Sequence, residues 1–93
     1  MVEKVNNTNL AIYLIEGVRT KGLNDEQLNK IGEKVYRYGR KNWGWDSING
    51  EHFFASCFIM RKFGYDKDSV KAAEKELPLD IKNVLDSYIN QAE

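Results

Sequence analysis

Three side chains near the middle of the sequence could support nucleophilic chemistry: His52, Ser56 and Cys57. His52 and Cys57 are five positions apart, so on one helix their side chains would point roughly 140° away from each other. A Cys–His nucleophile pair within that helix is therefore excluded. His52 and Ser56 would share a face. A serine hydroxyl beside a histidine is only weakly activated as a nucleophile, however, when an orienting acid and an oxyanion hole are missing. We expect no catalytic residue and no enzymatic activity, with His52 as a capping or partly buried polar residue and Cys57 as a small core hydrophobe.

Metal and cofactor binding are not indicated by the residues present. One histidine and one cysteine fall short of the four Cys or His ligands that a structural zinc site normally uses. The segment from Asp66 to Ser69, DKDS, lacks the glycine and the terminal glutamate of a calcium-binding loop. The glycines are dispersed along the chain and form no phosphate-binding loop. We expect neither a metal nor a cofactor.

A series of cations could bind an anionic partner. At 100° per residue on a helix, four of them lie within roughly 60° of one another and form a ridge roughly 16 Å long. Glu26 and Glu33 are expected to pair with Lys30 and Arg37, four residues further on, which would offset part of the repulsion within the ridge. The alternative is an ordinary solvated helix face. The residues of this basic ridge are Lys30, Lys34, Arg37 and Lys41.

Aromatic residues are concentrated around and after the ridge: of 11 in the chain, nine lie between Tyr36 and Tyr65. This density exceeds what one buried helix face needs, so we expect some rings to reach the surface. Trp43 and Trp45 have two interpretations, either core anchors that lock a turn or hot spots of a protein-binding face. The same kinds of side chain also stack bases and hold phosphates. The candidate binding residues are Lys30, Lys34, Tyr36, Arg37, Arg40, Lys41, Trp43 and Trp45.

The elements that carry these residues are predicted to be five helices. The first is expected from Thr8, as N-cap, to Lys21, with Gly22 as its C-terminal stop. A short strand over residues 10–15 is the alternative for this segment.

The second helix shows a capping box, with Asn24 as the cap and Gln27 at the third helical position. It is expected to end near Asn42. Its apolar arc consists of Leu28, Ile31, Val35 and Tyr38.

The third helix is expected to begin at Ser47 or Asn49 and to end before Gly64. It is apolar nearly all round, which is typical of the buried centre of a domain or of a helix that docks a partner. A fourth helix should start at Asp66 or Asp68 and end at Leu77-Pro78, because proline disfavours helical geometry in the preceding residue. Apolar residues of the fourth and fifth helices are Val70, Ala73, Leu77, Ile81, Val84, Leu85 and Tyr88.

Length and charge limit the possible functions. A chain of 93 residues with a net charge of zero is expected to form one helical domain over residues 1–93, with residues 1–7 as a flexible tail. A neutral chain does not coat nucleic acid or membranes by charge alone. One cysteine and no secretion signal favour a cytoplasmic protein without membrane contact.

These observations predict an all-α protein, a small compact bundle of about five helices. We expect a non-enzymatic protein that binds another macromolecule, a protein partner, as a regulator or inhibitor. The size and composition suggest the further hypothesis of a phage-encoded protein directed at a host machine. The alternative is a nucleic-acid-binding module that uses the basic ridge.

Overall fold

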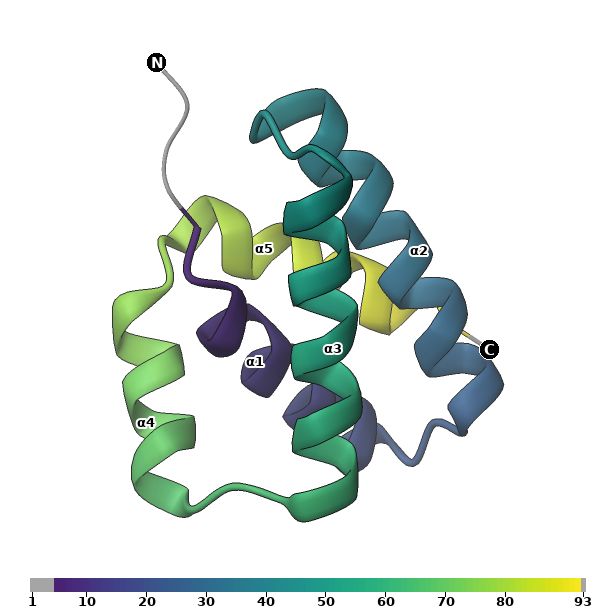
Figure 1. The fold of residues 1–93 in the computed structure, drawn as a ribbon. Helices are drawn as coiled ribbons and strands as arrows, with labels where there is room; N and C mark the ends of the chain where they lie inside the picture. The colour runs from purple at the N-terminus through teal and green to yellow at the C-terminus, as the bar shows by residue number, and fades with distance from the viewer. Residues whose placement is uncertain (1–4, 93) are drawn as a thin grey trace.

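The computed structural model describes residues 5–92, which form five α-helices joined by short turns (Figure 1). The part of the chain that is described contains no strand, so the predicted all-α bundle is confirmed and the strand considered for residues 10–15 does not form. The helices are α1 (Asn7–Lys21), α2 (Asp25–Asn42), α3 (Ser47–Phe63), α4 (Lys67–Glu76) and α5 (Leu79–Gln91).

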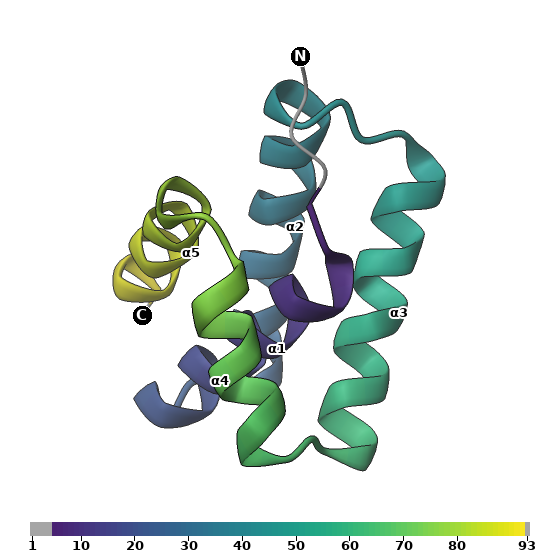
Figure 2. The same ribbon diagram turned by 90° about the vertical axis from the view of Figure 1, so that its left-hand side faces the viewer.

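The centre of the bundle is α1. It packs against α3, α4 and α5, and both views show it passing through the middle of the molecule between α3 and α4 (Figures 1 and 2). Its buried apolar residues spread over roughly 200° around the helix axis, so more than half of the helix circumference is covered. The buried apolar residues of α1 are Leu10, Ala11, Ile12, Leu14, Ile15 and Val18.

The third helix, by contrast, is not the buried centre. Only Gly50, Phe53 and Cys57 of α3 are buried. The apolar sequence of α3 was compatible with a buried central helix or with a helix that docks a partner, and the structure excludes the buried central helix. The physical reason is that Phe53 and Cys57, with the half-buried Met60, form the side of α3 that packs against the core. The remaining large apolar side chains of α3 are exposed.

The start of α1 differs from the prediction. Asn6 is the N-cap, and its side chain accepts a hydrogen bond from the backbone N–H of Asn9 at 3.0 Å. The helix therefore begins before Thr8, which becomes an ordinary first-turn residue; asparagine and threonine are both good caps, so either choice was open locally. Of the expected tail, residues 1–4 lie outside the described residues, while Val5 packs against the core and Asn7 is helical.

The remaining helix ends follow their local signals. Asn24 and Gln27 form the predicted capping box, with hydrogen bonds of 2.9 and 2.8 Å. Gly22 ends α1 with a left-handed φ of 72°, a conformation that favours glycine. Leu77 is extended and ends α4, and Pro78 precedes the first residue of α5.

The turn between α2 and α3 is built around Gly39. The backbone N–H groups of Trp43 and Trp45 donate to the Gly39 carbonyl at 2.9 and 3.1 Å. A Cβ atom at position 39 would lie only 2.5 Å from the Trp45 ring. Because glycine has no side chain, both indoles can close over the end of α2, and this packing fixes where α3 begins.

Candidate functional site

The two tryptophans predicted as binding residues lie in the core. Trp43 and Trp45 are 9% and 8% exposed, and their ring centroids are 5.2 Å apart. Trp45 also packs against Phe53, with 5.5 Å between the centroids. Both rings contribute to the wall of a surface pocket of about 690 Å³ between the start of α1 and α3. Because more than nine-tenths of each tryptophan is buried against other side chains, this is nevertheless the geometry of core anchors.

Tyr36 and Arg40 lie at the edge of the contact between α2 and α3. The half-buried Tyr36 ring occupies the space that a side chain at Gly50 would need, and its centroid is 5.8 Å from that of Phe54. The Arg40 guanidinium lies 5.8 Å from the Tyr36 centroid, within the range of a cation–π interaction. Tyr36 therefore holds the two helices together, and Arg40 is the exposed member of the pair.

The basic ridge lies on the surface of α2, and all four of its cations are exposed. Lys30 forms the expected ion pair with Glu26, at 3.6 Å. Residues 5–92 contain no ion pair between Glu33 and Arg37, so that predicted pair does not form. Exposed pairs of this kind contribute little stability, so the ridge remains a set of solvated cations.

Three ridge cations share a groove with α5, which we call the basic groove. Lys34, Arg37 and Lys41 line it, and its volume is about 450 Å³. The Lys34 ammonium lies 5.8 Å from the centroid of Tyr88. Burial, together with the neighbouring Tyr38, raises the pKa of Tyr88, so its hydroxyl is a neutral hydrogen-bond donor. None of the lining residues is acidic, which suits an anion. They are Lys34, Arg37, Tyr38, Lys41, Asn42 and Tyr88.

A second surface lies on the outer side of α3. Figure 2 shows this helix at the edge of the molecule, on the opposite side from α5. Of the six large apolar side chains that are exposed among the described residues, five belong to α3. Seen along the helix axis, they span roughly half of its circumference. We call this set the apolar face; its residues are Ile48, Phe54, Phe58, Ile59 and Phe63.

The apolar face carries few charges. Lys62 lies within it, with its ammonium 5.8 Å from the Phe58 centroid and 5.6 Å from the Phe63 centroid. Glu51 lies near the other end of the same side of the helix. Single exposed apolar residues are common on protein surfaces, but a contiguous group with few charges is typical of an interaction site.

This surface could be predicted from the sequence only in part. The prediction that some aromatic rings reach the surface is confirmed for Phe54, Phe58 and Phe63. The candidate binding residues, however, were expected on the segment before α3, because arginine, tyrosine and tryptophan gather there. The available signal for α3 was its apolar sequence all round, which also fitted a buried helix.

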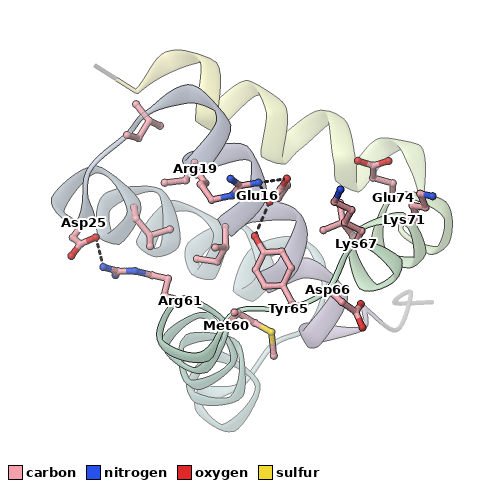
Figure 3. Close-up of a pocket in the computed structure, with 16 residues that line it drawn as sticks. Glu16, Arg19, Asp25, Met60, Arg61, Tyr65, Asp66, Lys67, Lys71 and Glu74 are labelled. Carbon is pink, nitrogen blue, oxygen red and sulfur yellow. Dashed lines mark hydrogen bonds and ion pairs between the residues drawn. The ribbon is translucent and has the colours of Figure 1, made fainter.

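A third concave surface lies between α1, α4 and the ends of α2 and α3 (Figure 3). Its volume is about 830 Å³. Charged side chains from all four helices surround it, as the close-up shows. The apolar residues in its lining are Ile15, Val18, Leu23, Leu28, Met60 and Val70.

Several charges around this groove are paired with one another. Arg19 forms an ion pair with Glu16 at 2.8 Å, and the Tyr65 hydroxyl donates to Glu16 at 3.0 Å (Figure 3). The hydrogen bonds from Arg19 and Tyr65 lower the pKa of Glu16, while burial and the bond to Glu16 raise the pKa of Tyr65 to about 12. Arg61 pairs with Asp25. These contacts tie the α3–α4 turn to α1, so they have a structural explanation.

The structure separates two of the residues considered for catalysis, His52 and Cys57. His52 is exposed, whereas Cys57 is buried. Burial raises the pKa of the Cys57 thiol to about 12, so the thiol is neutral and unreactive. Its predicted core role is confirmed.

The described residues form neither a cluster of metal ligands nor a membrane-spanning helix. Residues 5–92 contain no group of three or more His, Cys, Asp or Glu side chains that could hold a metal ion. None of the helices in this part of the chain has the length and apolar character needed to span a bilayer.

Comparison with known proteins adds no assignment. No protein-family model, curated protein or solved structure matches this chain. The surfaces described above therefore carry the information about function.

Proposed function

We propose that this chain is a non-enzymatic protein that binds a protein partner, as a regulator or inhibitor, and that its binding surface is the apolar face of α3. The observation that carries the proposal is the exposure of Phe58 and Phe63, which are 64% and 75% exposed. Burying one such ring gains about 1.5–3 kcal/mol. A partner that covers both gains that free energy without changing the core.

The apolar face is large enough for a specific contact. With roughly 200 Å² for each side chain, exposed fractions between 39% and 75% leave roughly 550 Å² of its surface in water. This is near the upper end of the roughly 300–600 Å² expected for the largest apolar patch on a monomer. It also approaches the roughly 800 Å² that each partner contributes to a standard interface.

The chemistry of the face favours a protein over a nucleic acid. Its members are phenylalanine and isoleucine, with one charge of each sign nearby, Glu51 and Lys62. Nucleic-acid surfaces need an excess of cations to neutralise phosphates. An apolar helix face instead fits the groove or helix of another protein.

The test places a photoreactive phenylalanine analogue at Phe58 in the chain, expressed in its native cells. We expect a discrete cross-linked protein, because a desolvated interface brings the analogue into van der Waals contact with the partner. The adduct should disappear when Ile59 and Phe63 are both replaced by glutamine, a residue that helices accept well.

The matched control places the same analogue at Lys41, which is also exposed but lies on the basic ridge. It should give no comparable adduct. Equal adducts at both positions, or an adduct at position 58 that ignores Ile59 and Phe63, would contradict the proposal.

A second candidate function is nucleic-acid binding by the basic ridge. It is supported by the basic groove, where Lys34, Arg37 and Lys41 surround Tyr88 without an acidic lining residue. Cations could hold phosphates there and a tyrosine could stack a base. The zero net charge of the chain provides no general attraction for a polyanion, so this function ranks second.

Fluorescence anisotropy with a labelled single-stranded oligonucleotide tests this second function. If it is correct, replacing Arg37 and Lys41 by glutamine weakens binding to every sequence. The slope of the logarithm of the binding constant against the logarithm of the salt concentration also becomes shallower by about 1–2. Phe58→Gln should bind like the wild type. The absence of binding at low salt would remove this candidate.

A further inference from the structure

The apolar face has a charge pattern that is complementary to itself. Glu51 and Lys62 are 11 positions apart, so on α3 they point within roughly 20° of each other and lie about 16 Å apart along the axis. Both are exposed, and among residues 5–92 neither takes part in an ion pair. The face thus has an acid near its start and a base near its end.

From this pattern we propose that the protein partner at the apolar face is a second copy of this chain, with the two α3 helices antiparallel across a two-fold axis. The inference rests on the proposed function, because it uses the same face. In an antiparallel pair centred midway between Glu51 and Lys62, each glutamate lies opposite the lysine of the other copy. A parallel pair would instead place like charges together, which destabilises the contact.

The same register also matches the sizes of the apolar side chains. The centre lies between positions 56 and 57, so Phe58 of each copy lies opposite Ala55 of the other. A large ring thereby meets a small, exposed residue, as close helix packing requires. A two-fold interface requires this kind of self-complementarity from a single surface.

The direction of this contact is free of the rest of the bundle. The centre of the antiparallel register points roughly 150° away from the buried side of α3, where Phe53 and Cys57 contact the core. The Lys62 ammonium already lies over the rings of Phe58 and Phe63, so its side chain extends across the face that would be covered.

The area is sufficient for a weak or moderate dimer. Covering the apolar face in both copies removes up to roughly 1,100 Å² of apolar surface, close to the total of about 1,000 Å² that a specific interface buries. We therefore expect a reversible dimer that dissociates on dilution.

Sedimentation equilibrium on the full chain tests the inference. Wild type should show a monomer–dimer equilibrium. Glu51→Lys and Lys62→Glu should each weaken the dimer at least about tenfold, because every opposed pair then becomes like-charged. An equimolar mixture of these two variants should dimerise again, since both opposed pairs in the mixed dimer have opposite signs. The chain that carries both substitutions should also recover.

The control is Lys41→Glu, which makes the same charge change on the basic ridge and should leave the dimer unchanged. All variants should keep the wild-type far-UV circular dichroism spectrum, because the substituted positions are exposed. Phe58→Gln should abolish the dimer without affecting the spectrum.

A chain that stays monomeric up to about 1 mM would overturn the inference, as would a dimer that is unaffected by the two charge reversals. The adduct formed at Phe58 separates this failure from that of the proposed function. If the chain is monomeric but cross-links a different protein in a manner that depends on Ile59 and Phe63, only the second-copy inference fails. If neither a dimer nor an adduct forms, both proposals fail.

Discussion

Replacing Trp45 by alanine should destabilise the free protein severely. The ring is 8% exposed, and it packs against Trp43 and Phe53 with centroid distances of 5.2 and 5.5 Å. Truncating a buried tryptophan costs about 3–5 kcal/mol, and each lost aromatic contact adds roughly 0.5–1.5 kcal/mol to the transfer term. We therefore expect a loss near 5 kcal/mol, about as large as the whole stability of many small domains.

The assay is thermal and urea unfolding, followed by circular dichroism at a helix-sensitive wavelength. A loss of 1 kcal/mol lowers the Tm of a domain of this size by about 4–8 °C, so the variant should melt at least about 15 °C lower or be unfolded at room temperature. The matched control is Phe58→Ala, which removes an aromatic ring that is 64% exposed and should change stability by no more than about 0.5 kcal/mol. If Trp45→Ala melts like the wild type, the assignment of Trp45 to the core is wrong.

Four further predictions concern the interior and the α3–α4 turn. Cys57 should react slowly with a thiol reagent in the native state and rapidly in denaturant, because it is buried and its pKa is raised to about 12; rapid native labelling would contradict this. Gly39→Ala should cost about 1–3 kcal/mol in urea unfolding, because the added methyl group overlaps the Trp45 ring, and an unchanged midpoint would refute the close approach. Tyr65 should contribute stability below its unfolded pKa of 10.0 that is lost as the pH rises through its folded pKa of about 12. Glu16, whose pKa is lowered from 4.5, should contribute stability that is lost as the pH falls through its folded pKa. Urea midpoints of wild type and Tyr65→Phe across this range check both signs, and a variant with the same alkaline loss as wild type would contradict the role of Tyr65.

The helix boundaries could be predicted because they depend on neighbouring residues. Gly22 supplies the left-handed conformation that ends α1, and the Asn24–Gln27 capping box starts α2. These interactions involve residues within one turn of each other, so the sequence contains all the information that they need. The exception is α1, where Asn6 and Thr8 were both suitable caps and the packing of Val5 against the core accompanies the earlier start.

The position of each helix in the bundle could not be predicted in the same way. The apolar segments of α1 and α3 look alike along the chain, but only α1 is covered on most sides. Which one becomes the centre depends on contacts between residues far apart in sequence. The binding residues illustrate the same limit: Trp43 and Trp45 are buried because Gly39 leaves room for both rings, a fit that composition does not reveal.

The central claim, that the apolar face of α3 is a protein-binding surface, can be tested most directly by fluorine NMR with fluorinated phenylalanine. The chain has four phenylalanines: Phe53 is buried, while Phe54, Phe58 and Phe63 belong to the apolar face. Spectra of the dilute purified protein are compared with spectra recorded in its native cells. We predict that the resonances of Phe58 and Phe63 shift or broaden in the cells while that of Phe53 keeps its position. If Phe58 and Phe63 retain the narrow, solvent-exposed resonances of the dilute protein under both conditions, the face is not covered and the claim is contradicted.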